Sequence, residues 1–211
     1  MGPVNKPPTI HSFFPSIIAL VVGLLGVWFY GSDKVNFPDA NDYLVSARAI
    51  YDGTLYPRRN LGLPFFRAPM YPLFISFTWH LFPSSIVAIK IFQAILHALT
   101  CWILVGMSTR ILPSRASSVG AILFAVNPLV VFPILEIQSE TLHTFLMALC
   151  LSLLLKFCSD PKKEKLPFLF GMSGAAASLC RPTAFVVVLA LLPIIWMKSI
   201  RGLLFDLPPE N

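Results

Sequence analysis

Charged residues are scarce in this chain. Only 12% of its 211 residues are Asp, Glu, Lys or Arg, whereas 56% are hydrophobic. A soluble domain has about a quarter of its residues charged, so the composition excludes an ordinary soluble domain and indicates an integral membrane protein. The formal net charge of +6 does not indicate a nucleic-acid partner, because the basic residues are scattered among short loops, as they are in membrane proteins.

Cysteines and signature motifs are also sparse. The four cysteines have none of the spacings of a metal knuckle or a disulfide framework, and we interpret each as a small buried hydrophobic residue. No glycine-rich nucleotide loop, G-x-S-x-G elbow or zincin motif is present. The sequence therefore disfavours ATP or a nucleotide sugar as a substrate. The cysteines are Cys101, Cys150, Cys158 and Cys180.

Hydrophobic segments predict about six membrane crossings. The first, residues 13–30, is uncharged and long enough to cross a hydrocarbon core of about 30 Å. Lys6 precedes it and no small-residue cleavage site follows it, which predicts a retained signal-anchor helix with a cytoplasmic N-terminus. Five further crossings are expected over residues 86–107, 117–134, 140–157, 166–179 and 183–197. A bend is expected at Asn127-Pro128 in the third crossing.

The basic residues orient these crossings. With the N-terminus in the cytoplasm, the short cytoplasmic loops carry Arg110, Arg115, Lys162, Lys163, Lys165, Lys198 and Arg201. This distribution satisfies the positive-inside rule and places the loop of residues 31–84 on the external or lumenal face. The predicted fold is an all-α polytopic membrane protein, with residues 1–211 forming a single module.

Two surface helices are predicted in the external loop. The first begins at Pro38-Asp39 and ends at Asp52-Gly53, and the second covers residues 70–82, which are too few to span a membrane. Asp39 and Asp42 are candidates for a general base that deprotonates an acceptor hydroxyl. The alternative is that Asp39 is a helix N-cap and Asp42 its partner in the first turn.

Arginines on the external face are candidate ligands for phosphate. A guanidinium can bind a phosphate through two hydrogen bonds, which is a possible role for Arg58, Arg59 and Arg67. Arg67 has the alternative of an arginine that extends from a helix start toward water. Arg181 lies between two hydrophobic segments, where a charge is costly enough to suggest a function.

A polar stripe lies on the second crossing. Lys90, Gln93 and His97 fall on one helical face, and such a stripe usually faces the protein interior or a wet cavity. The alternative is hydrogen bonding between helices, with Lys90 extending outward.

A further polar group follows the third crossing: Glu136, Glu140 and His143. Glu140-x-x-His143 has the spacing of a carboxylate and an imidazole in a helical metal site. Two ligands alone are weak evidence, and we favour a pairing of the carboxylate with an external arginine. No metal or other cofactor is therefore expected.

An ordered set of short motifs resembles the first external loop of GT-C glycosyltransferases. Pro38 to Tyr56 reads P-D-x-x-D-Y-x-x-x-A-R-x-x-x-x-G-x-x-Y, and Arg67 to Phe74 reads R-x-P-x-Y-P-L-F. The likeness is to the branch with the dolichyl-phosphate-mannose protein mannosyltransferases and the lipid A aminoarabinose transferases. Later landmarks are K-x-x-Q-A from Lys90, Asn127-Pro128, S-E-T from Ser139 and L-C-R-P-T from Leu179.

The resemblance implies a glycosyltransferase with a polyprenyl-phosphate sugar donor. Transfer would invert the anomeric carbon and reach an acceptor hydroxyl of a lipid, protein or glycan on the external face. The family's catalytic aspartate maps to Asp39, with Asp42 as the second candidate, and its phosphate-holding cations map to Arg67 and Arg181. The aminoarabinose branch has a metal-binding glutamate where Arg67 stands, which weakens the case for a metal here.

Family members usually continue through further crossings, so we expect this chain to correspond to their N-terminal part. The alternative to an enzyme is a non-catalytic subunit that binds lipid phosphate or assists assembly with a second membrane subunit. A small transporter would favour internal repeats, and none is evident.

Overall fold

The computed structural model describes residues 10–54, 67–110, 112–159 and 165–196. These ranges contain nine α-helices and no strand, which confirms the all-α prediction. The helices are α1 (Ile10–Tyr30), α2 (Ala40–Tyr51), α3 (Met70–Leu81), α4 (Ile86–Ser108), α5 (Ser114–Val126), α6 (Pro128–Leu135), α7 (Glu140–Ser159), α8 (Lys165–Cys180) and α9 (Thr183–Trp196).

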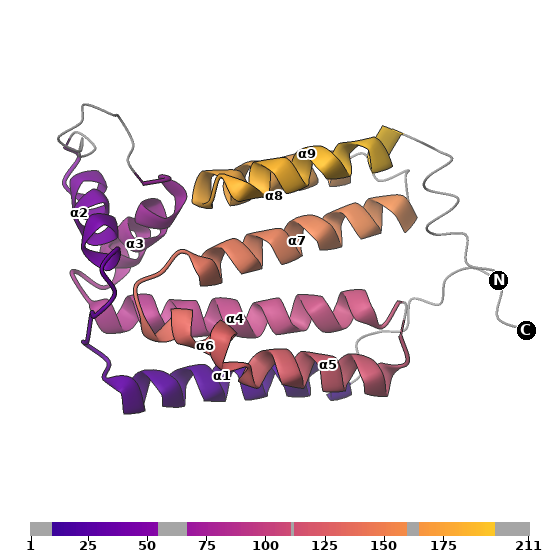
Figure 1. Cartoon of the computed structure of the whole chain (residues 1–211), viewed down its shortest axis with the longest axis horizontal. Coiled ribbons are helices and arrows are strands. Elements are labelled where there is room, and N and C mark those ends of the chain that lie inside the picture. The colour runs from indigo at the N-terminus through magenta and orange to yellow at the C-terminus, as the bar shows by residue number, and fades with distance from the viewer. Residues whose placement is uncertain (1–9, 55–66, 111, 160–164, 197–211) are drawn as a thin grey trace, which may run out of the picture.

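The long helices form a bundle with α2 and α3 at one end (Figure 1). α1, α4, α5, α7, α8 and α9 run along the length of the molecule, whereas α2 and α3 lie across its end. α1 packs on α4 and α5, α4 packs on α7, α7 packs on α8, and α8 packs on α9. This order brings the start of α7 and the end of α8 toward α3.

Three helices are each long and apolar enough to cross a membrane. They are α1, α4 and α7, and α5 with α6 forms a fourth candidate if the two helices are taken as one bent span. A helix needs about 20 apolar residues to cross a bilayer. The chain is thus an integral membrane protein with three or four candidate spans in the part that the structure describes.

The third predicted crossing is broken where the sequence indicates a bend. α5 and α6 meet at an angle of 46°. Asn127 has an extended backbone, its side-chain oxygen accepts a hydrogen bond from Leu129 N at 2.9 Å, and Pro128 begins α6. Asn127 therefore caps a new helix, and Pro128 suits the first position because it has no N–H to leave unpaired. The bend at Asn127-Pro128 is confirmed.

The last two predicted crossings correspond to shorter helices. α8 has 16 residues and α9 has 14, and the apolar part of α9 is Thr183–Pro193. Both are shorter than the usual length of a span, although they run beside α7 (Figure 1). The total of six crossings therefore stays a prediction.

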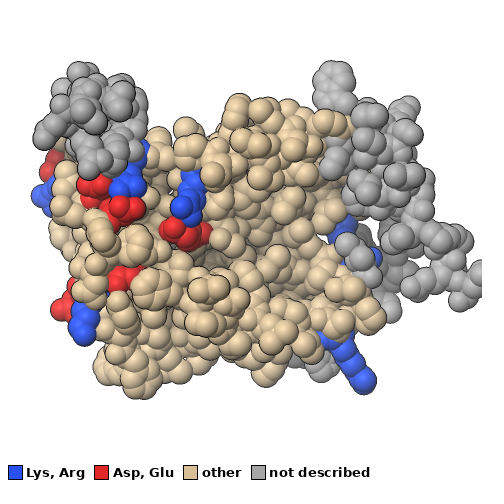
Figure 2. Space-filling view, in the orientation of Figure 1, with Lys and Arg blue, Asp and Glu red and all other residues tan. Residues whose placement is uncertain are grey.

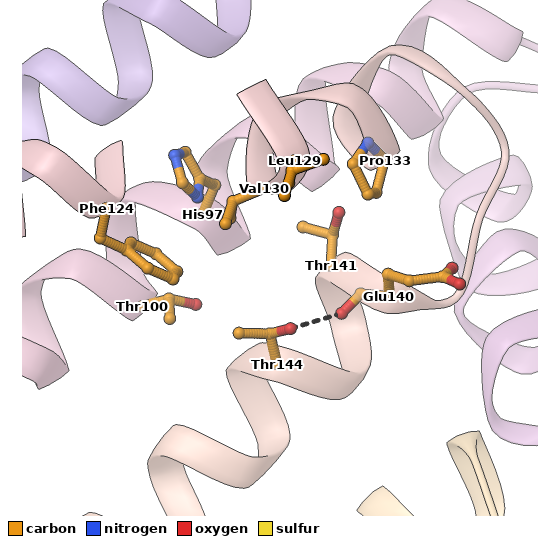
Figure 3. Close-up of a pocket in the computed structure, with 9 residues that line it drawn as sticks. All are labelled: His97, Thr100, Phe124, Leu129, Val130, Pro133, Glu140, Thr141 and Thr144. Atoms are coloured by element: carbon orange, nitrogen blue, oxygen red, sulfur yellow. Dashed lines mark hydrogen bonds between the residues drawn. The ribbon is translucent and has the colours of Figure 1, made fainter. Parts of the chain in front are cut away.

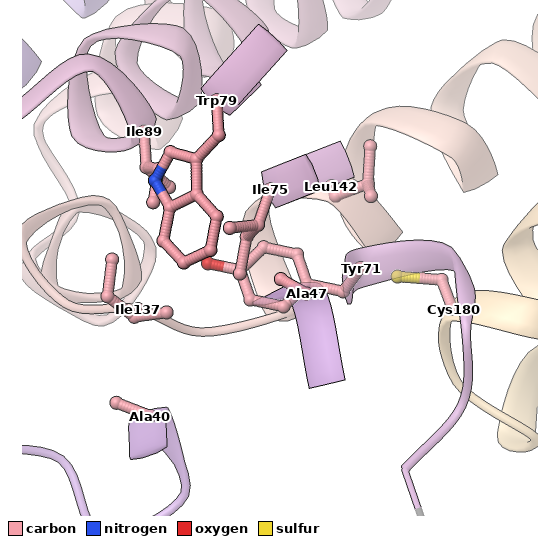
Figure 4. Packing of buried hydrophobic residues seen from close by; sticks show 9 residues of the cluster. All are labelled: Ala40, Ala47, Tyr71, Ile75, Trp79, Ile89, Ile137, Leu142 and Cys180. Atoms are coloured by element: carbon pink, nitrogen blue, oxygen red, sulfur yellow. The ribbon is translucent and has the colours of Figure 1, made fainter. Parts of the chain in front are cut away.

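A buried cluster attaches α2 and α3 to the bundle (Figure 4). Tyr71, Ile75 and Trp79 project from α3, and α2 contributes Ala40 and Ala47. The remaining members come from α4, α7, α8 and the segment before α7: Ile89, Leu142, Cys180 and Ile137. The spacing of 71, 75 and 79 places these side chains on one face of α3. This face of α3 attaches α2 and α3 to the rest of the bundle.

Acidic and basic side chains are distributed unequally between the ends of the bundle. Figure 2 shows red and blue side chains together at the end formed by α2 and α3. All six acidic residues in the described ranges belong to this end: Asp33, Asp39, Asp42, Asp52, Glu136 and Glu140. The charged residues described at the opposite end are all basic: Arg110, Arg115, Lys156 and Lys165.

Candidate functional site

The structure brings together three of the predicted site residues at the starts of α2 and α3. Arg67 Nη2 lies 2.5 Å from Asp39 Oδ1 and 3.1 Å from Asp42 Oδ2, and Arg67 Nε lies 3.3 Å from the same Asp42 oxygen. Asp39 and Asp42 are three residues apart, so they share a helical face. Arg67 reaches both because it lies shortly before Pro69, the N-cap residue of α3, and α3 packs on α2.

The Asp39 side chain faces Arg67 rather than the helix backbone. Asp39 occupies the N-cap position of α2, but its carboxylate makes no capping hydrogen bond. The Asp39 and Asp42 side chains are 44% and 45% exposed, and Arg67 is 21% exposed. The carboxylates are thus open to solvent, while the guanidinium is largely enclosed.

Arg67 also lies over an aromatic ring. Its guanidinium carbon is 5.3 Å from the centre of the Tyr43 ring, within the range of a cation–π contact. Burial lowers the pKa of Arg67, and the hydrogen bonds to Asp39 and Asp42 raise it. The net result is a pKa above the ordinary value for arginine. Arg67 therefore remains a cation. This is an enclosed, paired arginine rather than one that merely extends toward water.

A buried column of side chains supports Tyr43. The Tyr43 ring meets Tyr71 edge to face, with ring centres 4.9 Å apart, and the Tyr71 hydroxyl donates to Gln93 Oε1 at 2.5 Å. Burial raises the pKa of Tyr71 well above its ordinary value, so the hydroxyl keeps its proton. Gln93 Nε2 in turn donates to the backbone carbonyls of Pro133, Ile134 and Glu136, at 3.1, 3.1 and 2.8 Å.

Lys90 points into the protein and holds the loop before α2. It is fully buried, and its Nζ donates to the backbone carbonyls of Gly31 at 3.1 Å and Lys34 at 2.7 Å. Lys90 does not extend outward, so that part of the sequence alternative is wrong. The sequence alternative also included hydrogen bonding between helices. Lys90 does hydrogen-bond to another segment, the loop after α1.

Glu136 also binds this loop and the end of α1. Its carboxylate accepts hydrogen bonds from the Tyr30 hydroxyl at 2.6 Å and from Asn36 N at 3.2 Å. The side chain is almost completely buried. Glu136 and Lys90 thus fix the segment that leads from α1 to Asp39.

Arg181 and Glu140 form a second ion pair. Arg181 Nη1 donates to Glu140 Oε1 at 2.9 Å, and both side chains are partly exposed. Glu140 begins α7 and Arg181 lies between α8 and α9. The expected pairing of Glu140 with an external arginine is therefore present. His143 follows one turn later on α7 and is partly buried.

Ser139 connects the two ion-pair clusters. The Tyr43 hydroxyl donates to Ser139 Oγ at 3.3 Å, and Ser139 directly precedes Glu140. On the other side, Cys180 Sγ donates to the Ser139 carbonyl at 3.6 Å, and Cys180 directly precedes Arg181. Tyr43, which contacts Arg67, and Cys180, which precedes Arg181, thus bond to the same residue. Tyr43, Tyr71 and Ser139 had no role assigned from sequence, although each lies within a quoted motif.

A cavity of about 170 Å³ extends between α4, α5, α6 and α7. It is lined by His97, Thr100, Phe124, Leu129, Val130, Pro133, Glu140, Thr141 and Thr144 (Figure 3). The Glu140 side chain points away from the other lining residues in Figure 3, toward its partner Arg181. The His97 ring contacts the Ala125 carbonyl through Nε2 at 3.1 Å, which leaves the bend between α5 and α6 with one fewer unpaired carbonyl.

The remaining candidates add little to this geometry. Arg58 and Arg59 lie outside the described residues. Among the residues that are described, no group of three His, Cys, Asp or Glu side chains is placed to hold a metal ion. The site therefore consists of two cations, three carboxylates and the hydroxyls between them.

A family model described as "Dolichyl-phosphate-mannose-protein mannosyltransferase" matches residues 66–205. The match begins just before Arg67 and continues past α9, so it includes Arg67, Glu140 and Arg181, whereas Asp39 and Asp42 precede it. No curated protein and no solved structure matches the chain.

Proposed function

The chain belongs to the dolichyl-phosphate-mannose-protein mannosyltransferase family, and on this premise we propose that it moves a sugar from a polyprenyl-phosphate carrier to an acceptor hydroxyl. The observation that carries the proposal is the arrangement at the end of the bundle. Exposed carboxylates on α2 lie beside an enclosed arginine, and a chain of contacts through Tyr43, Ser139 and Cys180 leads to a second arginine, Arg181. A base and a cationic clamp are what transfer from a phosphate-linked sugar requires.

In the proposed reaction the acceptor oxygen attacks the anomeric carbon from the face opposite the phosphate. Asp39 takes the proton of the acceptor hydroxyl. The bond between the anomeric carbon and the phosphate oxygen breaks, and its electron pair stays on that oxygen. Arg67 and Arg181 stabilise the added negative charge on the phosphate. Inversion of the anomeric carbon follows from attack on the opposite face.

We place this site on the external or lumenal side, with α2 and α3 at the membrane surface and both chain ends in the cytoplasm. In this arrangement α8 and α9 count as the fifth and sixth crossings. The basic residues at the far end of the bundle support this orientation, because Arg110, Arg115, Lys156 and Lys165 then lie on the cytoplasmic side, as the positive-inside rule requires.

The test is transfer of radiolabelled mannose from a polyprenyl-phosphate carrier to endogenous acceptors in membranes that contain the chain. We expect Asp39→Asn to lower the transfer rate by about 10²–10⁴-fold, the usual contribution of a general base, with unchanged membrane insertion. Asp52→Asn is the matched control, because it removes one charge at the other end of α2, and it should retain the wild-type rate. Wild-type transfer by Asp39→Asn would remove the catalytic assignment.

The transfer assay, combined with a measurement of binding, distinguishes the proposed enzyme from a non-catalytic subunit. Such a subunit would show no transfer in any variant. A separate binding measurement, with polyprenyl phosphate that carries no sugar, would still detect binding to it. Binding that depends on Arg67 without detectable transfer would therefore favour the subunit.

A further inference from the structure

The proposed phosphate-binding arginine is already bound to the proposed base. Arg67 Nη2 contacts both aspartates and Nε contacts Asp42. Nε and Nη2 form one edge of the guanidinium, and such an edge binds a carboxylate or a phosphate through parallel hydrogen bonds. A phosphate that approached this edge would meet Asp39 and Asp42 as competitors for the same two donors.

We propose that the sugar donor binds by exchange, in which its phosphate replaces Asp42 and Asp39 on the Nε–Nη2 edge of Arg67. This inference rests on the proposed function. Release from Arg67 leaves the Asp39 carboxylate free to accept the proton of the acceptor hydroxyl. Asp39 is therefore available as a base when the sugar donor is bound. When the donor is absent, Asp39 is paired with Arg67. Asp42 acts as a positioning residue that keeps the guanidinium in its waiting orientation.

The contacts around Arg67 make such an exchange possible. Tyr43 contacts the guanidinium from the ring face, whereas the aspartates contact its edge. A change of partner at the edge therefore leaves the cation–π contact intact. The Tyr43 ring is itself fixed by Tyr71 and by Ser139, so Arg67 keeps its place while its hydrogen-bond partners change.

The exposure of the two carboxylates also favours exchange. Nearly half of each aspartate side chain is accessible to solvent, so water can replace the guanidinium when the aspartates are released. The ion pairs are open to water on the carboxylate side, although Arg67 itself is largely enclosed. A phosphate also accepts charge-assisted hydrogen bonds from the same two donors, so it competes directly with the aspartates for them.

Exchange predicts that removal of a competitor strengthens phosphate binding. The experiment measures the affinity of the full chain, in phosphatidylcholine nanodiscs, for polyprenyl phosphate that carries no sugar. We expect Asp42→Asn to tighten binding about three- to tenfold and Arg67→Ala to weaken it about tenfold or more. Asp42→Asn in the Arg67→Ala background should have no effect, because the donors that Asp42 competes for are gone.

Asp52→Asn is the matched control. It removes the same charge from α2, but Asp52 pairs with Arg48 and not with Arg67, so it should change the affinity by less than twofold. An equal gain in Asp52→Asn would show that net charge alone explains the effect and would overturn exchange. Inorganic phosphate added as a competitor should reduce binding in wild type and more strongly in Asp42→Asn.

The outcomes separate this inference from the proposed function. If Arg67→Ala weakens binding but Asp42→Asn leaves it unchanged or weaker, the arginine clamp stands and exchange is wrong, because the aspartates would then assist Arg67 rather than compete for it. If Arg67→Ala leaves binding unchanged, the clamp itself is wrong and the proposed function loses its phosphate site.

Discussion

Two sets of polar residues in this protein differ in the kind of partner that they bind. Lys90 and Gln93 lie inside the bundle and bind backbone carbonyls. Arg67, Asp39 and Asp42 lie at the end of the bundle and bind one another through side chains that are partly exposed. The inner set has partners that the fold supplies permanently, whereas the outer set has partners that a ligand can replace.

This difference separates residues that build the site from residues that act in it. A buried donor without a partner is costly, so the bonds of Lys90 and Gln93 last as long as the fold does. The carboxylates of the outer cluster are partly exposed and water can hydrate them when their partner changes, so the outer cluster can change partners without damage to the fold. Substitutions in the inner set should therefore change stability, and substitutions in the outer set should change binding and transfer.

The largest stability effect is expected at Gln93. Gln93→Leu leaves the Tyr71 hydroxyl and three backbone carbonyls without their partner, and we expect a loss of about 2–3 kcal/mol in the free energy of unfolding. Denaturant titration of the purified protein in detergent measures it. The matched control is Thr100→Val on the same helix, because Thr100 is equally buried but bonds only within α4. Equal losses in both variants would contradict a special role for Gln93.

Arg181 should affect binding of the donor rather than stability. Arg181→Ala removes one of the two proposed phosphate ligands, and we expect the KM for the polyprenyl-phosphate sugar to rise about tenfold with kcat within a fewfold of wild type. Arg181→Lys keeps the charge and should recover part of the loss. Steady-state transfer kinetics measure both, and a fall in kcat at unchanged KM would oppose the assignment.

The smallest effect is expected for the exposed pair at the end of α2. Asp52→Asn removes the ion pair with Arg48, in which both side chains are well exposed. We expect the free energy of unfolding to change by less than about 0.5 kcal/mol, because Asp52 also lies at the unfavourable end of the helix dipole. A loss as large as that of Gln93→Leu would erase the distinction between the two sets.

Local sequence signals predicted the elements of the fold well. The break at Asn127-Pro128 and the limits of α2 follow from residues within one turn of each boundary. The outer cluster was also foreseeable in part, because Asp39 and Asp42 share a helical face and Arg67 precedes the next helix. The sequence could not establish that the three meet, since this depends on how α3 packs on α2.

The role of Lys90 was harder to foresee for a physical reason. Its partners are backbone carbonyls of Gly31 and Lys34, and every residue has such a carbonyl, so no residue type indicates the contact. Glu140 and Arg181 lie 41 residues apart, and only the packing of α7 on α8 brings them together. Hydropathy and the basic residues of the flanking loops predict one crossing each for residues 166–179 and 183–197, and the short lengths of α8 and α9 leave both crossings as predictions.

We propose above that the Arg67 cluster lies on the side where the sugar of a lipid carrier is transferred, opposite the basic end of the bundle. Val45→Cys on α2 and Arg115→Cys on α5 place single thiols on exposed residues at the two ends, and labelling of the wild-type chain gives the background from its own cysteines. A membrane-impermeant maleimide is applied to intact cells or to sealed, correctly oriented vesicles. We expect labelling of Val45→Cys from the external or lumenal side and labelling of Arg115→Cys only after permeabilisation. The reverse pattern would place Asp39 and Arg67 in the cytoplasm and contradict the proposed orientation.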